Sequence, residues 1–154
     1  QMLANTRFET APTRSPFDWD LSPQPGVEQT RRDRDGLEVR FLGEENIADV
    51  GVSQYAVVSP GRYRFTVEWS AEHITTDEGV YFRITDIENP GRLHAETAPV
   101  LGTLARTSVV LHVRVPAETR VLRVQLARTP TLKFDNALEG VLRIHRVELA
   151  PAPS

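Results

Sequence analysis

Two neighbouring segments alternate between apolar and polar residues, and this alternation constrains the fold more than any other feature. In residues 62–70 the apolar positions are Tyr63, Phe65, Val67 and Trp69. In residues 80–85 the apolar positions are Val80, Phe82 and Ile84. Successive side chains of a strand point to opposite faces, so each segment is predicted to be a half-buried strand. A polar turn separates the segments, which favours a hairpin-like pair.

Shorter alternating segments, separated by turn residues, occupy much of the remaining chain. They predict strands at residues 37–41, 53–58, 92–98, 108–115, 120–127 and 141–149. No segment keeps a 3.6-residue period over three helical turns. About eight short strands without helices predict an all-β fold, an antiparallel two-sheet β-sandwich of the jelly-roll type.

The whole chain, residues 1–154, is expected to form one domain, because this length suits a single hydrophobic core. Residues 1–36 are expected to be irregular, since their stretch SPFDWDLSPQPG contains three prolines and a glycine. Residues 24–36 include the charged run RRDRD and are expected to be a solvated loop. Residues 150–154 are expected to be a tail.

Composition and charge exclude several classes of function. The formal net charge of −3 gives no basic field for nucleic acid, and no apolar run is long enough for membrane insertion. The chain has no cysteine, so disulfides and Cys-ligated zinc are excluded, while the compartment stays open. The cell envelope or the extracellular space is expected if the domain belongs to an exported protein. No cofactor is expected.

Arginine dominates the basic residues: all but Lys133 of the 18 are arginine. One interpretation is a GC-rich genome, which carries no functional meaning. The other is a need for planar, fork-shaped donors that bind carboxylates, phosphates or sugar hydroxyls. The positions of the arginines on the strands are expected to decide between the two.

Four short motifs follow one another along the chain. They are Asn5–Glu9, Pro16–Trp19, Gln54 with Pro60–Tyr63, and residues 140–149. Their order resembles the N-G-x-F-E, P-x-x-W, Q…PG-x-Y and closing G-x-x-x-x-x-x-V-x-L segments of bacterial carbohydrate-binding-module-like jelly rolls of the galactose-binding superfamily. More loosely, the pattern resembles the domain at the end of some bacterial tetratricopeptide-repeat proteins linked to exopolysaccharide export. The resemblance implies a non-catalytic, carbohydrate-binding accessory domain.

The resemblance also raises the question of whether the matching residues of this chain could hold a structural calcium ion. In many such modules the glutamate of the first motif and an acidic pair in the last strand hold this ion. The positions that match are Glu9, His145 and Arg146. Calcium prefers a cage of oxygen ligands, and arginine offers none, so no calcium is expected.

A sugar site needs flat aromatic faces for a pyranose and polar groups for its hydroxyls. The aromatic candidates are Trp19, Tyr55 and Tyr81. Trp19 is alternatively a core-capping residue, and Tyr81 is alternatively a surface tyrosine packed along an arginine stem.

Jelly rolls bind ligands on the concave sheet in one common mode. If the polar residues Arg40, Arg83, Arg123 and Gln125 lie on that one sheet, they form a groove whose arginines favour an acidic polysaccharide. The alternative is a scattered, solvent-facing set paired with glutamates. The predicted ligand-binding residues are Trp19, Arg40, Tyr81, Arg83, Arg123 and Gln125.

No catalytic motif accompanies these residues, so no enzyme activity is expected. The four histidines lack metal-ligand spacing, nothing positions Asp18 and Asp20 as a glycosidase pair, and Ser70 lacks the context of a nucleophile. The leading hypothesis is a module that binds a polysaccharide or oligosaccharide. The alternative is a protein-interaction or assembly domain of a larger bacterial envelope or secretion-associated protein, whose partners are other domains of that protein.

Overall fold

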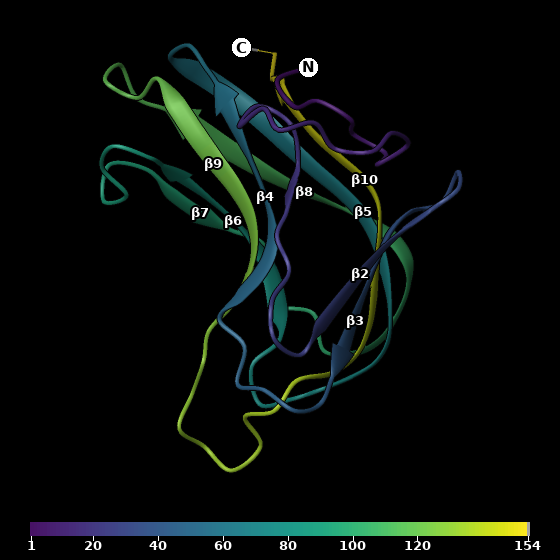
Figure 1. The fold of residues 1–154 in the computed structure, drawn as a ribbon. Helices are drawn as coiled ribbons and strands as arrows, with labels where there is room; N and C mark the ends of the chain where they lie inside the picture. The colour runs from purple at the N-terminus through teal and green to yellow at the C-terminus, as the bar shows by residue number, and fades with distance from the viewer. Residues whose placement is uncertain (154) are drawn as a thin grey trace.

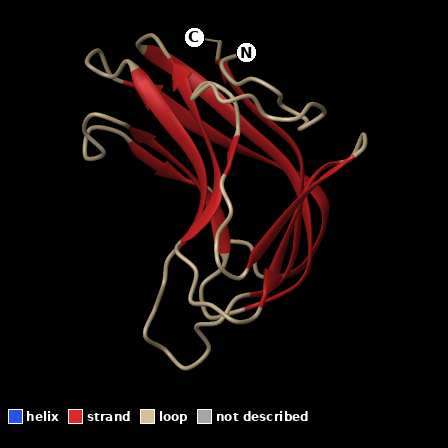
Figure 2. Ribbon diagram, in the orientation of Figure 1, coloured by secondary structure: helices blue, strands red, loops and turns tan. Residues whose placement is uncertain are grey.

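The computed structural model describes residues 1–153, which form a sandwich of two five-stranded sheets (Figures 1 and 2). Sheet A contains, in spatial order, β1 (Asp20–Leu21), β4 (Asp49–Val57), β9 (Val121–Arg128), β6 (Val80–Asp86) and β7 (His94–Glu96). Sheet B contains β2 (Val27–Arg32), β3 (Gly36–Leu42), β10 (Glu139–Pro151), β5 (Gly61–Thr75) and β8 (Gly102–Val115). Every pair of neighbouring strands is antiparallel, which confirms the predicted all-β sandwich.

The alternating residues of β5 and β6 meet in the core between the two sheets. Phe82 of β6 packs against Phe65 and Trp69 of β5, with ring centroids 5.5 Å and 5.7 Å apart. All three side chains are buried, and full burial of a large apolar side chain stabilises a fold by about 1.5–3 kcal/mol. The predicted hairpin between these strands is wrong, because β5 lies in sheet B and β6 lies in sheet A. Their periodicity defined the buried faces but not the pairing partners.

Two strands form within the N-terminal segment that was expected to be irregular. Residues 27–32, expected to be part of a loop, form β2, which pairs with β3 at the edge of sheet B. An edge strand is paired on one side only and tolerates exposed charges, which explains why this charged sequence is a strand. The two-residue β1 pairs with β4, and β10 extends to Pro151, into the expected tail. The sandwich therefore has ten strands, where about eight were expected.

The curvature of the sheets gives the two outer faces different shapes. β4 and β9 bow toward sheet B, so the outer face of sheet A is concave, whereas the outer face of sheet B is convex (Figure 1). The connection of residues 129–138 between β9 and β10 extends from one end of the sandwich, and both termini lie at the other end (Figure 1). These features define the surfaces on which a ligand is able to lie.

Candidate functional site

The concave outer face of sheet A carries two rows of polar side chains that cross its strands. Strand register places one row across β4, β9, β6 and β7, formed by Ser53, Gln125, Arg83 and Glu96. The next row is formed by Tyr55, Arg123, Thr85 and His94. Directly opposed residues have Cβ atoms about 4.5–5.5 Å apart, so each row is a continuous polar strip.

The period-two pattern of β6 and β9 explains why these side chains lie together. Leu122, Val124 and Leu126 of β9 are fully buried toward the core, so Arg123 and Gln125 between them face outward. The same alternation in β6 turns its polar residues outward, and the antiparallel register then aligns them with those of β9.

One depression on the concave face brings together most of the predicted residues. It has a volume of about 340 Å³ and is lined by Tyr81, Arg83, Arg123 and Gln125, together with residues that include Asp49 and Thr129. The Tyr81 hydroxyl lies 3.1 Å from the Thr129 hydroxyl, so the tyrosine ring is held in one place and is largely buried. Four of the six residues predicted from the sequence therefore line one depression.

Three polar side chains of this depression, those of Arg83, Arg123 and Gln125, form no hydrogen bond within residues 1–153. Gln125 is only 7% exposed, and its side-chain amide forms no hydrogen bond there. The Nε of Arg123 is buried and likewise lacks a hydrogen-bond partner. Buried polar groups are normally hydrogen-bonded, and leaving one unpaired costs about 1–3 kcal/mol. The buried Arg123 Nε is out of reach of a ligand, but the other donors of Arg83 and Arg123 and the amide of Gln125 also lack partners and line the depression, so they suit a ligand that supplies acceptors.

Arg128 fixes one end of the depression. Its fully buried guanidinium, with five N–H groups, lies within hydrogen-bonding distance of six acceptors, including Asp77 at 2.8 Å, Asn46 at 2.7 Å and the carbonyl of Asn136 at 2.8 Å. The hydroxyl of Thr131 and the charge of Arg128 lower the pKa of Asp77, so this carboxylate stays ionised. The arginine thus joins three connecting segments. The sequence pattern did not reveal this role of Arg128, because nothing in the sequence indicates that an arginine at the end of a strand is buried.

The other two predicted residues lie outside this depression. Arg40 belongs to β3 of sheet B, where its side chain is 48% exposed, so it does not share a groove with Arg83 and the other groove residues. Trp19 is 1% exposed and stacks on Phe8 with ring centroids 4.7 Å apart. Its Nε1 donates a 2.9 Å hydrogen bond to the carbonyl of Asn5. Trp19 is therefore packed as a core-capping residue, although it also lines a second depression beside Tyr55.

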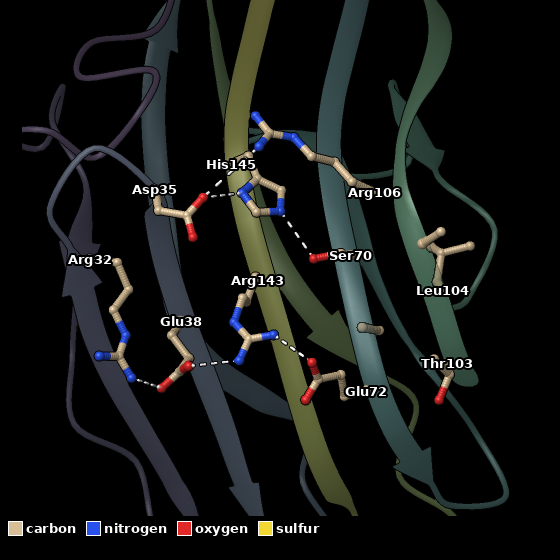
Figure 3. Close-up of a pocket in the computed structure, with 12 residues that line it drawn as sticks. Arg32, Asp35, Glu38, Ser70, Glu72, Thr103, Leu104, Arg106, Arg143 and His145 are labelled. Carbon is tan, nitrogen blue, oxygen red and sulfur yellow. Dashed lines mark hydrogen bonds and ion pairs between the residues drawn. The ribbon is translucent and has the colours of Figure 1, made fainter.

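One part of the convex face of sheet B, across β2, β3, β10 and β5, carries ion pairs in place of open donors (Figure 3). Glu38 lies 2.8 Å from Arg32 and 3.3 Å from Arg143, which also lies 2.9 Å from Glu72. The hydrogen bond from Arg32, followed by the charges of the neighbouring arginines, lowers the pKa of Glu38. These charges compensate one another, so this part of the face matches the paired, solvent-facing alternative that the sequence left open.

Beside these ion pairs, three residues form a hydrogen-bonded chain in the order of a serine-hydrolase triad (Figure 3). Ser70 Oγ lies 3.0 Å from His145 Nε2, and His145 Nδ1 lies 3.1 Å from Asp35 Oδ1. The residues come from β5, β10 and the β2–β3 turn, so sequence spacing did not reveal the arrangement. Ser70 lies at an irregularity in the pairing of β5 with β8, and Asp35 is 52% exposed. The hydrogen bonds through His145 connect the β2–β3 turn to the sheet.

Two kinds of feature are absent from residues 1–153. They hold no group of three or more histidine, cysteine or acidic side chains arranged to bind a metal ion. They also hold no helix with the length and apolar character needed to span a membrane.

Comparison with known proteins relates the fold to carbohydrate-binding modules. No family model and no curated protein matches the sequence. The solved structure of TmCBM61 in complex with β-1,4-galactotriose is 16% identical, with a TM-score of 0.59 over 98% of both chains. A CBM4 structure is 14% identical, with a TM-score of 0.54 over 97% of this chain and 99% of that one. An apo-form cyclase from Fischerella sp. is also 14% identical, with a TM-score of 0.53 over 99% and 96%.

At these identities the likeness establishes the fold alone. The protein has the β-sandwich of carbohydrate-binding modules, which at least one cyclase shares. What the protein binds therefore depends on its own side chains and not on the fold.

Proposed function

We propose that this protein is a non-catalytic module that binds a polysaccharide or oligosaccharide on the concave face of sheet A. The observation that carries the proposal is the convergence of unpartnered donors from Arg83, Arg123 and Gln125 on one depression. The fold of carbohydrate-binding modules supports the same function but does not by itself define a site.

The residue types fit the chemistry of a sugar. Hydroxyl groups donate and accept hydrogen bonds, and the amide of Gln125 offers both roles. The ring of Tyr55 provides apolar surface at one end of the second polar row, whereas the ring of Tyr81, opposite Ala127, is largely buried and contributes little surface. The depression is shallow, so the affinity is expected to be weak, with a Kd of about 1 μM to 1 mM.

The charge of the site favours an acidic polysaccharide over a neutral one. Neither Arg83 nor Arg123 has a carboxylate within 4.0 Å among residues 1–153, in contrast to the paired arginines of sheet B. A guanidinium binds a carboxylate with two parallel hydrogen bonds, which are about twice as strong as neutral ones. A uronate-containing chain would supply these carboxylates, with its hydroxyls left for Gln125.

The test is calorimetric titration with a uronate oligosaccharide and with a neutral galactan oligosaccharide. A hydrogen bond to a charged group contributes about 1.5–3 kcal/mol, so Arg83→Ala or Arg123→Ala is expected to weaken uronate binding about 10- to 150-fold. Arg40→Ala is the matched control, because this exposed arginine lies on the other sheet. Uronate binding that survives both substitutions removes the site assignment. Failure of every glycan to bind removes the proposed function.

A second candidate function, docking of a protein partner, is favoured by two exposed apolar side chains. Leu132 and Phe134 are fully exposed on the connection between β9 and β10, which projects from the sandwich (Figure 1). Sedimentation of the wild-type protein and of the Leu132→Ser/Phe134→Ser variant tests self-association through this connection. A wild-type monomer at all concentrations would exclude a self-docking role.

A further inference from the structure

Four basic side chains gather on the convex face of sheet B, at the end of the sandwich where both termini lie (Figure 1). This basic patch consists of Arg62, Arg64, His112 and Arg114. The strand register places Arg62 opposite Arg114 and Arg64 opposite His112. All four side chains are exposed, whereas Tyr63 and Val113 between them are buried, so the four share the outer face.

The basic patch differs from the rest of the same face. Elsewhere each outward arginine has an acidic partner, as in Arg106 with Glu68 and Arg146 with Glu148. Within residues 1–153, no carboxylate lies within 4.0 Å of Arg62, Arg64 or Arg114. Like charges directly opposite one another destabilise a sheet. The whole chain has a net charge of −3, so this concentration of positive charge is local.

The shape of the basic patch suits a small anion. Its residues line a depression of about 510 Å³, with Ala152 and Pro153 as one wall. Adjacent strands are about 4.8 Å apart and residues i and i+2 about 6.6 Å apart, so the four side chains start from the corners of a small rectangle. Side chains of arginine length are able to converge on one group above its centre.

The number of donors distinguishes between anions. A carboxylate has two oxygens, whereas a sulfate or phosphate monoester has three terminal oxygens. Guanidinium forks bind such oxygens in pairs of parallel hydrogen bonds. Three arginines around one depression therefore match the three terminal oxygens of such an ester better than the two oxygens of a carboxylate. We propose that the basic patch is a binding site for a sulfate or phosphate ester group.

The basic patch is only large enough for a single anionic group, so it does not suit an extended polyanion. Along the outer face of β5, Arg64 is followed by Thr66 and then by Glu68, which is already paired with Arg106. Nucleic-acid binding relies on neutralising many successive phosphates with a long basic surface. A single ester group carried by a small molecule or a sugar fits the observed extent.

The test uses heteronuclear NMR titration of the full chain with four probes at constant ionic strength: sodium phosphate, glucose 6-phosphate, glucuronate and sodium chloride. Glucose 6-phosphate is expected to shift the amides of β5 and β8 around the basic patch with a millimolar Kd. Inorganic phosphate is expected to shift the same amides, and glucuronate at least tenfold more weakly. Shifts of the β5 and β8 amides with inorganic phosphate but none with glucose 6-phosphate would overturn the ester assignment. Glucuronate shifting these same β5 and β8 amides with equal affinity would also overturn it, whereas glucuronate shifts on sheet A belong to the proposed glycan site.

The matched variants are Arg64→Gln/Arg114→Gln and, as a control on the same sheet, Arg40→Gln. The double variant is expected to lose at least tenfold in affinity for glucose 6-phosphate, and the control to bind as the wild type does. Without ligand, the thermal midpoint of the Arg64→Gln/Arg114→Gln variant is expected to equal or exceed that of the wild type, because repulsion among the like charges of the basic patch is reduced. Unchanged affinity in the double variant, or tighter binding of a short single-stranded oligonucleotide than of glucose 6-phosphate, would overturn the proposal. The concave face lies on the other sheet, so its proposed glycan site stands or fails independently.

Discussion

Replacing Arg128 by methionine removes the buried guanidinium and keeps a side chain of similar length. The structure places six acceptors within hydrogen-bonding distance of this guanidinium, and one of them, Asp77, also forms an ion pair with it. Removing one partner of a buried ion pair typically costs about 3–5 kcal/mol, because the remaining polar groups are left unpaired. That is a large part of the roughly 5–15 kcal/mol by which a domain is stable. For a chain of this length, the loss corresponds to a fall in Tm of roughly 6–20 °C.

The assay is equilibrium unfolding in urea, followed by the fluorescence of the two buried tryptophans, Trp19 and Trp69. Arg128→Lys is expected to be intermediate, because lysine keeps the charge but not the fork of donors. Arg40→Met is the control, with a change within about 0.5 kcal/mol for an exposed residue. A loss below about 1 kcal/mol for Arg128→Met would refute the claim that this side chain holds the connecting segments together.

Three further predictions concern stability and the surface. The free energy of unfolding is expected to decrease below about pH 4.5. Arginine partners lower the pKa of Glu38 and Glu68, so the stabilisation from these two ion-paired carboxylates is lost as they protonate. Urea midpoints that do not change between pH 7 and pH 3 would contradict this. Ser70→Ala is expected to cost about 0.5–1.5 kcal/mol and to leave the hydrolysis of p-nitrophenyl acetate at the wild-type level, whereas a rate that disappears with Ser70 would reveal catalysis. Phe134→Ser is expected to change the free energy of unfolding by less than about 0.5 kcal/mol, since the ring touches solvent on all sides; a larger loss in thermal melts would show hidden packing.

The alternation of side chains carried most of what could be predicted from the sequence. It correctly assigned Phe65 and Phe82 to the core, because a strand with one buried face repeats with period two. It also assigned Arg83 and Arg123 to outward faces, and antiparallel register then brought them together. Both assignments depend only on the local alternation of apolar and polar residues, which is visible in the sequence.

The pairing of the strands and the burial of charged side chains could not be predicted in the same way. Which strand lies beside which depends on contacts between distant segments, so the separation of Arg40 from Arg83 was not visible in either strand alone. The edge strand β2 was hidden because a charged edge and a charged loop have similar composition. The resemblance to domains linked to exopolysaccharide export stays a prediction.

The most direct test of the account is to map the amides that shift when a uronate oligosaccharide is added to isotope-labelled protein. The account predicts saturable shifts concentrated on β4, β6 and β9, centred on Arg83 and Gln125. Shifts confined to sheet B, or no shifts at millimolar oligosaccharide, would contradict the claim that the concave face binds glycans.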